Sequence, residues 1–188
     1  MKTAIIVHGM PSKEEYFDSD QDSQPTSHWL PWIKHELSTH TILTHIPAMP
    51  VPYAPVYEAW KAVFEGLEIQ EDTVLIGHSC GGGFLVRWLS ENKMQVGKVV
   101  LVAPWIDPTH ELDTGFFDFN IDERIVERTK GVTVLYSLDD DATILKTVEI
   151  LKEKLPTCTF QEFTNKGHFT LSDMNTREFP ELLQIVLQ

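Results

Sequence analysis

The chain has 188 residues, 42% of them hydrophobic, which suits a single globular domain spanning 1–188 with one core and not a disordered chain. Its formal net charge of −13 repels phosphate backbones and anionic lipid headgroups, so neither nucleic acid nor a membrane surface is expected as a partner. The two cysteines, Cys80 and Cys158, are too few for a disulfide framework and indicate a reducing compartment.

The first apolar segment, "TAIIVHG" (3–9), is a continuous run bounded by glycine, as expected of a buried strand. It does not resemble a signal peptide, because a single lysine precedes it and no small-residue cleavage site follows. No window of the sequence reaches the ~18 apolar residues that span a bilayer. We therefore expect a cytoplasmic protein.

Segments with strand and helix patterns then alternate along the chain. Strands are predicted over 3–9, 41–46, 72–79, 97–104, 132–137 and 158–163. Helices are predicted over 28–37, 55–67, 83–92, 122–129, 142–155 and 177–188, the last beginning later if Pro180 lies in its first turn. This order predicts an α/β fold, a three-layer αβα sandwich with a mostly parallel sheet.

Two long stretches interrupt the alternation and are predicted to be loops. Residues 10–27 are polar and rich in turn formers, and residues 104–121 mix aromatic with acidic side chains. Loops of this length in a compact domain are often functional. The aromatic side chains of the second loop form either an apolar wall over a site or part of the core; they are Trp105, Phe116, Phe117 and Phe119.

The stretch "VLIGHSCGGGF" (74–84) contains Gly-x-Ser-x-Gly between a predicted strand and a predicted helix. In that context the motif places a serine on a tight, strained turn, with its hydroxyl clear of the sheet. Gly77 and Gly81 leave the room that the close approach of strand and helix requires. A phosphate-binding loop is the alternative, but no Gly-Lys-Ser/Thr or Gly-x-Gly-x-x-Gly spacing is present. The motif therefore predicts Ser79 as a nucleophile.

A serine hydroxyl needs a general base, and the base needs an orienting acid. In this kind of fold the three residues follow the chain order serine, acid, histidine. His168 lies just after the last predicted strand, and no other histidine lies downstream of His110. His168 is therefore the predicted base.

The acid is expected after the strand 132–137, where Asp139, Asp140 and Asp141 follow one another. Asp140 fits best because the loop has left the strand there, and Asp139 is the close alternative. One of the three is expected to cap the helix that follows. A metal site built from these acids is disfavoured, because no second ligand cluster accompanies them.

Acyl chemistry also needs hydrogen-bond donors for the developing oxyanion. One predicted donor is the backbone N–H of Cys80, the residue after the serine. The other is expected in the loop after the first strand, where Met10 is preferred and Gly9 is the alternative.

The segments "IIVHGM", "LIGHSCGG", "VLVAPW", "SLDDDAT" and "NKGHFT" together resemble the small serine hydrolases typified by retinoblastoma-binding protein 9 and YdeN. The resemblance covers nearly the whole chain. It implies a compact α/β-hydrolase fold without a large cap domain, and a triad of Ser79, Asp140 and His168. Such proteins often carry a proline a few residues after the acid, where this chain has Ile144, so Asp139 stays open as the acid.

The sequence thus predicts a serine hydrolase that cleaves small carboxylic esters or related acyl compounds through an acyl-enzyme, with no metal or organic cofactor. Without a cap domain, we expect a shallow site and short-chain substrates. The alternative hypothesis is a catalytically weak protein of the same fold that binds a protein or ligand through its two long loops.

Overall fold

Six strands form one sheet at the centre of the computed structural model, which describes residues 2–188. The strands are β1 (Thr3–Val7), β2 (Leu43–His45), β3 (Val74–His78), β4 (Val99–Val102), β5 (Val132–Ser137) and β6 (Thr159–Phe163). Their order is β2-β1-β3-β4-β5-β6, and every neighbouring pair is parallel. The predicted parallel sheet is confirmed.

The central strands are buried along their whole length, which explains their continuous apolar sequences. In "VLIGH" and "VVLV", Ile76 pairs with Val100, and Gly77 pairs with Leu101. Because both faces of these strands are covered, an alternating polar and apolar pattern would place polar groups in the core. The central strands therefore present polar residues only where they end, at His78 and beyond, which is where a site can form.

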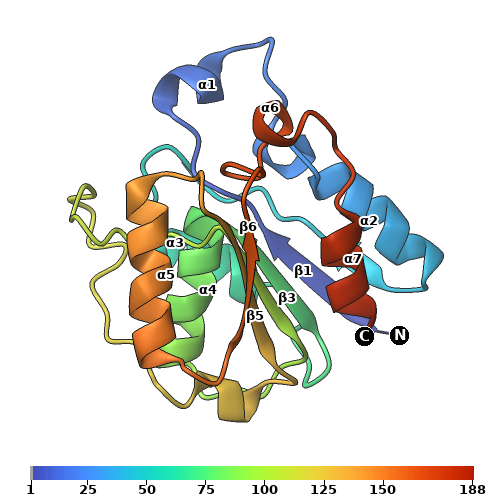
Figure 1. The fold of residues 1–188 in the computed structure, drawn as a ribbon, viewed down its shortest axis with the longest axis vertical. Coiled ribbons are helices and arrows are strands. Elements are labelled where there is room, and N and C mark those ends of the chain that lie inside the picture. Colours follow the sequence, from blue (N-terminus) through green and yellow to red (C-terminus); the bar gives the residue numbers. More distant parts are fainter. Residues whose placement is uncertain (1) are drawn as a thin grey trace.

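Helices cover both faces of the sheet, as Figure 1 shows. One face carries α2 (Leu30–Thr39) and α7 (Pro180–Leu187), which contact each other. The other face carries α3 (Tyr57–Glu65), α4 (Cys80–Glu91) and α5 (Ala142–Lys154). The predicted three-layer arrangement is confirmed, and α7 begins at Pro180, where proline needs no N–H partner.

Two short helices, α1 (Lys13–Phe17) and α6 (Leu171–Met174), lie beyond the carboxyl ends of the strands (Figure 1). The prediction of an uninterrupted loop over 10–27 was wrong, since this stretch holds α1 and a 3₁₀ turn, η1 (Gln24–Thr26). The reason is local: Ser12 and the third residue of α1, Glu15, form a capping box.

The predicted helix over 122–129 was also wrong, since the structure has only a four-residue 3₁₀ turn, η2 (Ile125–Arg128). The ends of this segment contact α4 and Lys93, just after α4, instead of continuing a helix. Asp122 forms ion pairs with Lys93 and Arg128, and its pKa is lowered to about 2, mainly by the hydrogen bond from Lys93. Arg128 also donates to the Leu89 carbonyl, so tertiary contacts override a weak helical pattern.

Within residues 2–188, no helix combines the length and the apolar composition needed to cross a membrane.

Candidate active site

Ser79 occupies the turn between β3 and α4 with a backbone conformation that side-chain-bearing residues rarely adopt, φ 54° and ψ −122°. Its N–H donates to the Val102 carbonyl at 2.9 Å, and its own carbonyl accepts from the N–H groups of Gly82 at 2.9 Å and Trp105 at 3.1 Å. These contacts tie the turn to β4 and to the first turn of α4. Packing around the turn therefore holds the strain in place.

The glycines of the motif are required by close backbone contacts. A Cβ at Gly77 would lie 2.6 Å from the carbonyl oxygen of Gly81, and one at Gly81 would lie 2.3 Å from that of Val7. Both distances are too short for any side chain. The amino end of α4 consequently packs directly on β1 and β3, which is what projects Ser79 at the edge of the sheet.

The structure brings the three predicted side chains together. Nε2 of His168 lies 2.9 Å from the Ser79 hydroxyl oxygen, and Nδ1 lies 3.0 and 3.1 Å from the two carboxylate oxygens of Asp140. With Nδ1–H donating to the carboxylate, Nε2 is the free acceptor that faces the hydroxyl. The Asp140 side chain is only 1% exposed, whereas 31% of the His168 side chain is exposed. The imidazole is thus fixed from the buried side and open toward solvent.

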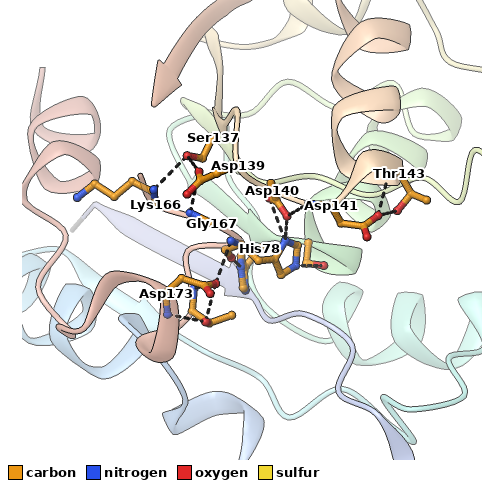
Figure 2. A network of polar contacts seen from close by, with 12 residues as sticks. His78, Ser137, Asp139, Asp140, Asp141, Thr143, Lys166, Gly167 and Asp173 are labelled. Atoms are coloured by element: carbon orange, nitrogen blue, oxygen red, sulfur yellow. Dashed lines mark hydrogen bonds and ion pairs between the residues drawn. The ribbon is translucent and has the colours of Figure 1, made fainter. Parts of the chain in front are cut away.

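The three consecutive aspartates have three different partners (Figure 2). Asp140 contacts the imidazole of His168, whereas Asp139 accepts hydrogen bonds from the Ser137 hydroxyl and, at 3.2 Å, from the N–H of Gly167. The Ser137 hydrogen bond lowers the pKa of Asp139. Asp141 caps α5 by accepting the Thr143 N–H at 2.8 Å.

The loop that carries His168 is held by its backbone as well as by its ring. Asp173 accepts the His168 N–H at 2.9 Å and the Thr170 hydroxyl at 2.7 Å (Figure 2). Asp173 and Thr170 form the capping box of α6. Sequence reasoning missed this residue, although the Thr-x-x-Asp spacing was visible.

His78 holds the peptide group on the other side of the His168 Cα. Its Nε2–H donates to the His168 carbonyl at 2.8 Å, and its ring is buried beside that of His168 at 5.1 Å between centroids. Burial is the main cause that lowers the pKa of His78 well below its usual range, and the nearby His168 adds to it. His78 is therefore a neutral donor, a role that the x position of Gly-x-Ser-x-Gly did not reveal.

The two predicted oxyanion donors, the N–H groups of Met10 and Cys80, have no hydrogen-bond partner within residues 2–188. The peptide that carries the Met10 N–H is fixed from its carbonyl side, because His8 Nδ1–H donates to the Gly9 carbonyl at 2.8 Å. His8 has this tautomer because its Nε2 accepts the Met49 N–H at 3.0 Å. The peptide is trans, so the Met10 N–H points opposite to that carbonyl.

Two cavities meet at the serine, and Met10, Ser79 and His168 line both. The first, called here the His28 cavity, has a volume of about 470 Å³ and is also lined by Glu15, Gln24, Ser27, His28, Thr170 and Leu171. The second, called the Trp105 cavity, has a volume of about 520 Å³ and is also lined by Trp105, Glu111, Asp141, Thr143 and Ile144. Neither lining includes a lysine or an arginine, so both cavities are electronegative.

The aromatic residues of the 104–121 loop divide between the two predicted roles. Trp105 is in the wall of the Trp105 cavity, as expected of an apolar wall beside Ser79. Phe116 is fully buried and packs edge-to-face on Trp60 at 5.0 Å between ring centroids, so it belongs to the core. Phe117 packs between Trp105 and Phe116 and lines neither cavity.

A parallel six-stranded sheet, with a strained serine turn after β3 and a histidine loop after β6, defines an α/β-hydrolase fold. Residues 18–186 match the family described as serine hydrolase, and the chain belongs to this family.

Solved structures share the fold over the whole chain. YdeN from B. subtilis superposes with a TM-score of 0.83 at 24% identity, over 100% of this chain and 97% of that one. A YdeN-like hydrolase from Pectobacterium atrosepticum superposes with a TM-score of 0.70 at 15% identity, over 100% and 90%. An esterase domain from Rhodothermus marinus superposes with a TM-score of 0.64 at 16% identity, over 92% and 80%. A comparison with curated proteins found no match.

Proposed function

We propose that the protein hydrolyses small carboxylic esters through a covalent acyl-enzyme formed on Ser79. The observation that carries this proposal is the continuous contact from the Asp140 carboxylate through both ring nitrogens of His168 to the Ser79 hydroxyl. A serine is a weak nucleophile unless a base within hydrogen-bond distance takes its proton, and here that distance is 2.9 Å.

In the acylation step, the Ser79 oxygen attacks the ester carbonyl while its proton moves to Nε2 of His168. Asp140 keeps the other ring proton on Nδ1 and stabilises the imidazolium that forms. The C–O bond to the alcohol then breaks, and the alcohol leaves with the proton from Nε2. The acyl group remains on the serine oxygen.

In the deacylation step, water takes the place of the alcohol. His168 accepts a proton from the water as its oxygen attacks the acyl carbonyl, and then returns a proton to Ser79. The products are the carboxylic acid and the free enzyme, so no redox partner or cofactor is consumed.

The N–H groups of Met10 and Cys80 are the proposed donors to the negatively charged carbonyl oxygen in both steps. Two properties support them: both groups lack a protein partner within residues 2–188, and Met10 lines both cavities at Ser79. Fixed donors of this kind contribute on the order of 10²- to 10³-fold each to the rate. The hydrogen bond from His8 to the Gly9 carbonyl favours Met10 over Gly9 as the donor.

The cavity linings favour a neutral substrate over an anionic one. Glu15 and Asp22 line the His28 cavity, and Glu111 and Asp141 line the Trp105 cavity, with no lysine or arginine to offset them. A substrate carboxylate or phosphate would be repelled from either. Small neutral esters also fit the modest cavity volumes, and an esterase domain is among the proteins that share the fold.

A fluorophosphonate probe followed by mass spectrometry tests the proposal. We expect labelling at Ser79, none in Ser79→Ala, and strongly slowed labelling in His168→Ala. A panel of p-nitrophenyl esters from acetate to octanoate then gives the acyl preference. A folded protein without labelling, and with turnover no higher than that of Ser79→Ala, would instead support the binding-protein hypothesis.

A further inference from the structure

His28 is a third histidine at the proposed active site, after His168 and His78, and sequence reasoning did not single it out. It lies just before α2 and lines the His28 cavity together with Ser79, Met10 and His168. Its backbone φ is 52°, a left-handed conformation that histidine tolerates better than most residues. The chain thus holds a histidine side chain in the wall of the cavity at Ser79 on an unusual backbone.

The protonation of the His28 ring follows from its hydrogen bond. The backbone N–H of Leu171 donates to Nδ1 at 3.2 Å, so Nδ1 carries no proton. The proton of the neutral ring is therefore on Nε2. Burial, followed by the charge of His168, lowers the pKa of His28 and favours this neutral form. Nε2 has no hydrogen-bond partner within residues 2–188. It is not one of the buried polar atoms that lack a partner, so it is accessible to solvent.

Neighbouring groups hold His28 in place before any substrate binds. Arg177 donates to the carbonyls of Thr26 and His28, each at 3.1 Å, and also pairs with Asp22. The ring packs edge-to-face on that of His78, with 5.6 Å between centroids. A donor fixed in this way loses little conformational freedom when it binds a ligand.

The hydroxyl groups in this wall, apart from that of Ser79, already have hydrogen-bond partners; the Ser172 hydroxyl lies 2.7 Å from that of Thr170. The Ser27 hydroxyl donates to the Gln24 carbonyl at 2.8 Å, and the Thr170 hydroxyl donates to Asp173 at 2.7 Å. The carboxylates of the wall, Glu15 and Asp22, can only accept. The side-chain amides of Gln21 and Gln24 also line the cavity, but no hydrogen bond within residues 2–188 fixes them. A substrate atom that accepts hydrogen bonds therefore finds a fixed, unengaged N–H at His28.

We propose that Nε2–H of His28 donates a hydrogen bond to an acceptor oxygen or nitrogen of the substrate, beyond the reacting ester group, and so selects esters that carry such an acceptor. This role rests on the proposed ester hydrolysis at Ser79. His28 is then a specificity residue that contacts the substrate, whereas His78 and Asp173 act only by positioning His168.

Two substitutions separate a substrate contact from a structural role. His28→Asn keeps a short acceptor for the Leu171 N–H and tolerates the left-handed backbone, but it removes the donor at the Nε2 position. His28→Gln keeps an N–H donor near that position and places no atom where Nδ1 was. If His28 only holds the Leu171 loop, His28→Gln should be the impaired variant. If His28 contacts the substrate, His28→Asn should be the impaired variant.

The substrates are ether esters, each paired with the ester in which a methylene replaces the ether oxygen. One series moves the oxygen along the acyl chain, beginning with methoxyacetate against butyrate; the other moves it along the alcohol, beginning with 2-methoxyethyl against butyl. The measured quantity is kcat/KM for the ether ester divided by kcat/KM for its methylene partner. This ratio is independent of the amount of active enzyme. Fluorophosphonate titration of Ser79 and thermal melting confirm that each variant is folded.

In at least one pair we expect His28→Asn to lower the ratio about three- to tenfold, the value of one neutral hydrogen bond, and His28→Gln to leave it within about twofold. An effect in the acyl series places the contact on the acyl side, and one in the alcohol series places it on the leaving group. A ratio that His28→Asn leaves unchanged in every pair, or that both variants lower equally, overturns the proposal. Failure of ester hydrolysis itself would appear separately, as wild-type protein with no turnover or labelling.

Discussion

The carboxylate of Asp139 accepts a 3.2 Å hydrogen bond from the backbone N–H of Gly167, the residue that precedes His168. Two consecutive aspartates therefore serve the same histidine by different routes. Asp140 contacts the ring, and Asp139 secures the loop that carries it (Figure 2). This division distinguishes two residues that the sequence left as alternatives.

We expect Asp140→Asn to lower kcat by about 10³-fold or more, because the amide no longer fixes the Nδ1–H tautomer or stabilises the imidazolium. Asp139→Asn retains an oxygen for the Gly167 N–H, so its loss should stay below about tenfold. Steady-state kinetics on one p-nitrophenyl ester, with thermal melts as the folding control, compare the two. Equal losses would show that the contact between Asp140 and His168 has no special role.

Cys80 is next to Ser79 but is not expected to act as a nucleophile. Its side chain is fully buried, and this burial raises the pKa of its thiol. Burial also raises the pKa of the Cys158 thiol, to about 11. Because only the thiolate reacts, iodoacetamide at pH 8 should leave both cysteines unmodified in the native protein over minutes and modify both in urea. Rapid native alkylation of Cys80 with loss of activity would make the thiol, and not Ser79, the leading nucleophile.

Gly81→Ala should destabilise the protein by more than about 3 kcal/mol, since the new methyl group would lie 2.3 Å from the Val7 carbonyl oxygen. Gly66→Ala is the matched control, because Gly66 has a helical φ of −70° and a Cβ there would meet nothing closer than 3.3 Å. The free energy of unfolding of Gly66→Ala should stay within about 1 kcal/mol of wild type. Urea unfolding measures both, and a mild effect at Gly81 would contradict the close packing of α4 on β1.

Stability should fall as the pH drops from about 6.5 toward 4. Burial lowers the pKa of His8 to about 4 in the folded protein, against 6.5 when unfolded. Between pH 6.5 and pH 4 the unfolded chain binds more protons than the folded protein. The stability that neutral His8 contributes is therefore complete above pH 6.5 and is lost as the pH falls toward 4. The expected loss from His8 is about 2 kcal/mol at pH 5, and His78 adds to it with the same sign. Equal free energies of unfolding at pH 7 and pH 5 would contradict this assignment.

The elements that could be predicted from the sequence are those with strong local patterns. The continuous apolar run of β3 and the glycines around Ser79 reflect burial and close backbone approach, and both leave a direct mark on residue type. The segment 122–129 shows the opposite case, because its helical pattern is weak and the ion pairs of Asp122 determine its shape. The capping boxes that form α1 and α6 were visible in the sequence and were overlooked.

By itself, the sequence determined the parallel α/β architecture and the chain order of serine, acid and histidine, because strand burial and tight turns restrict residues that are close in the chain. Only the tertiary structure decided which aspartate meets the ring of His168, and that His78, Asp173 and His28 surround it. These contacts join segments as far as 143 residues apart, as between His28 and Leu171. They depend on the directions in which loops leave the sheet, and no local pattern encodes those directions.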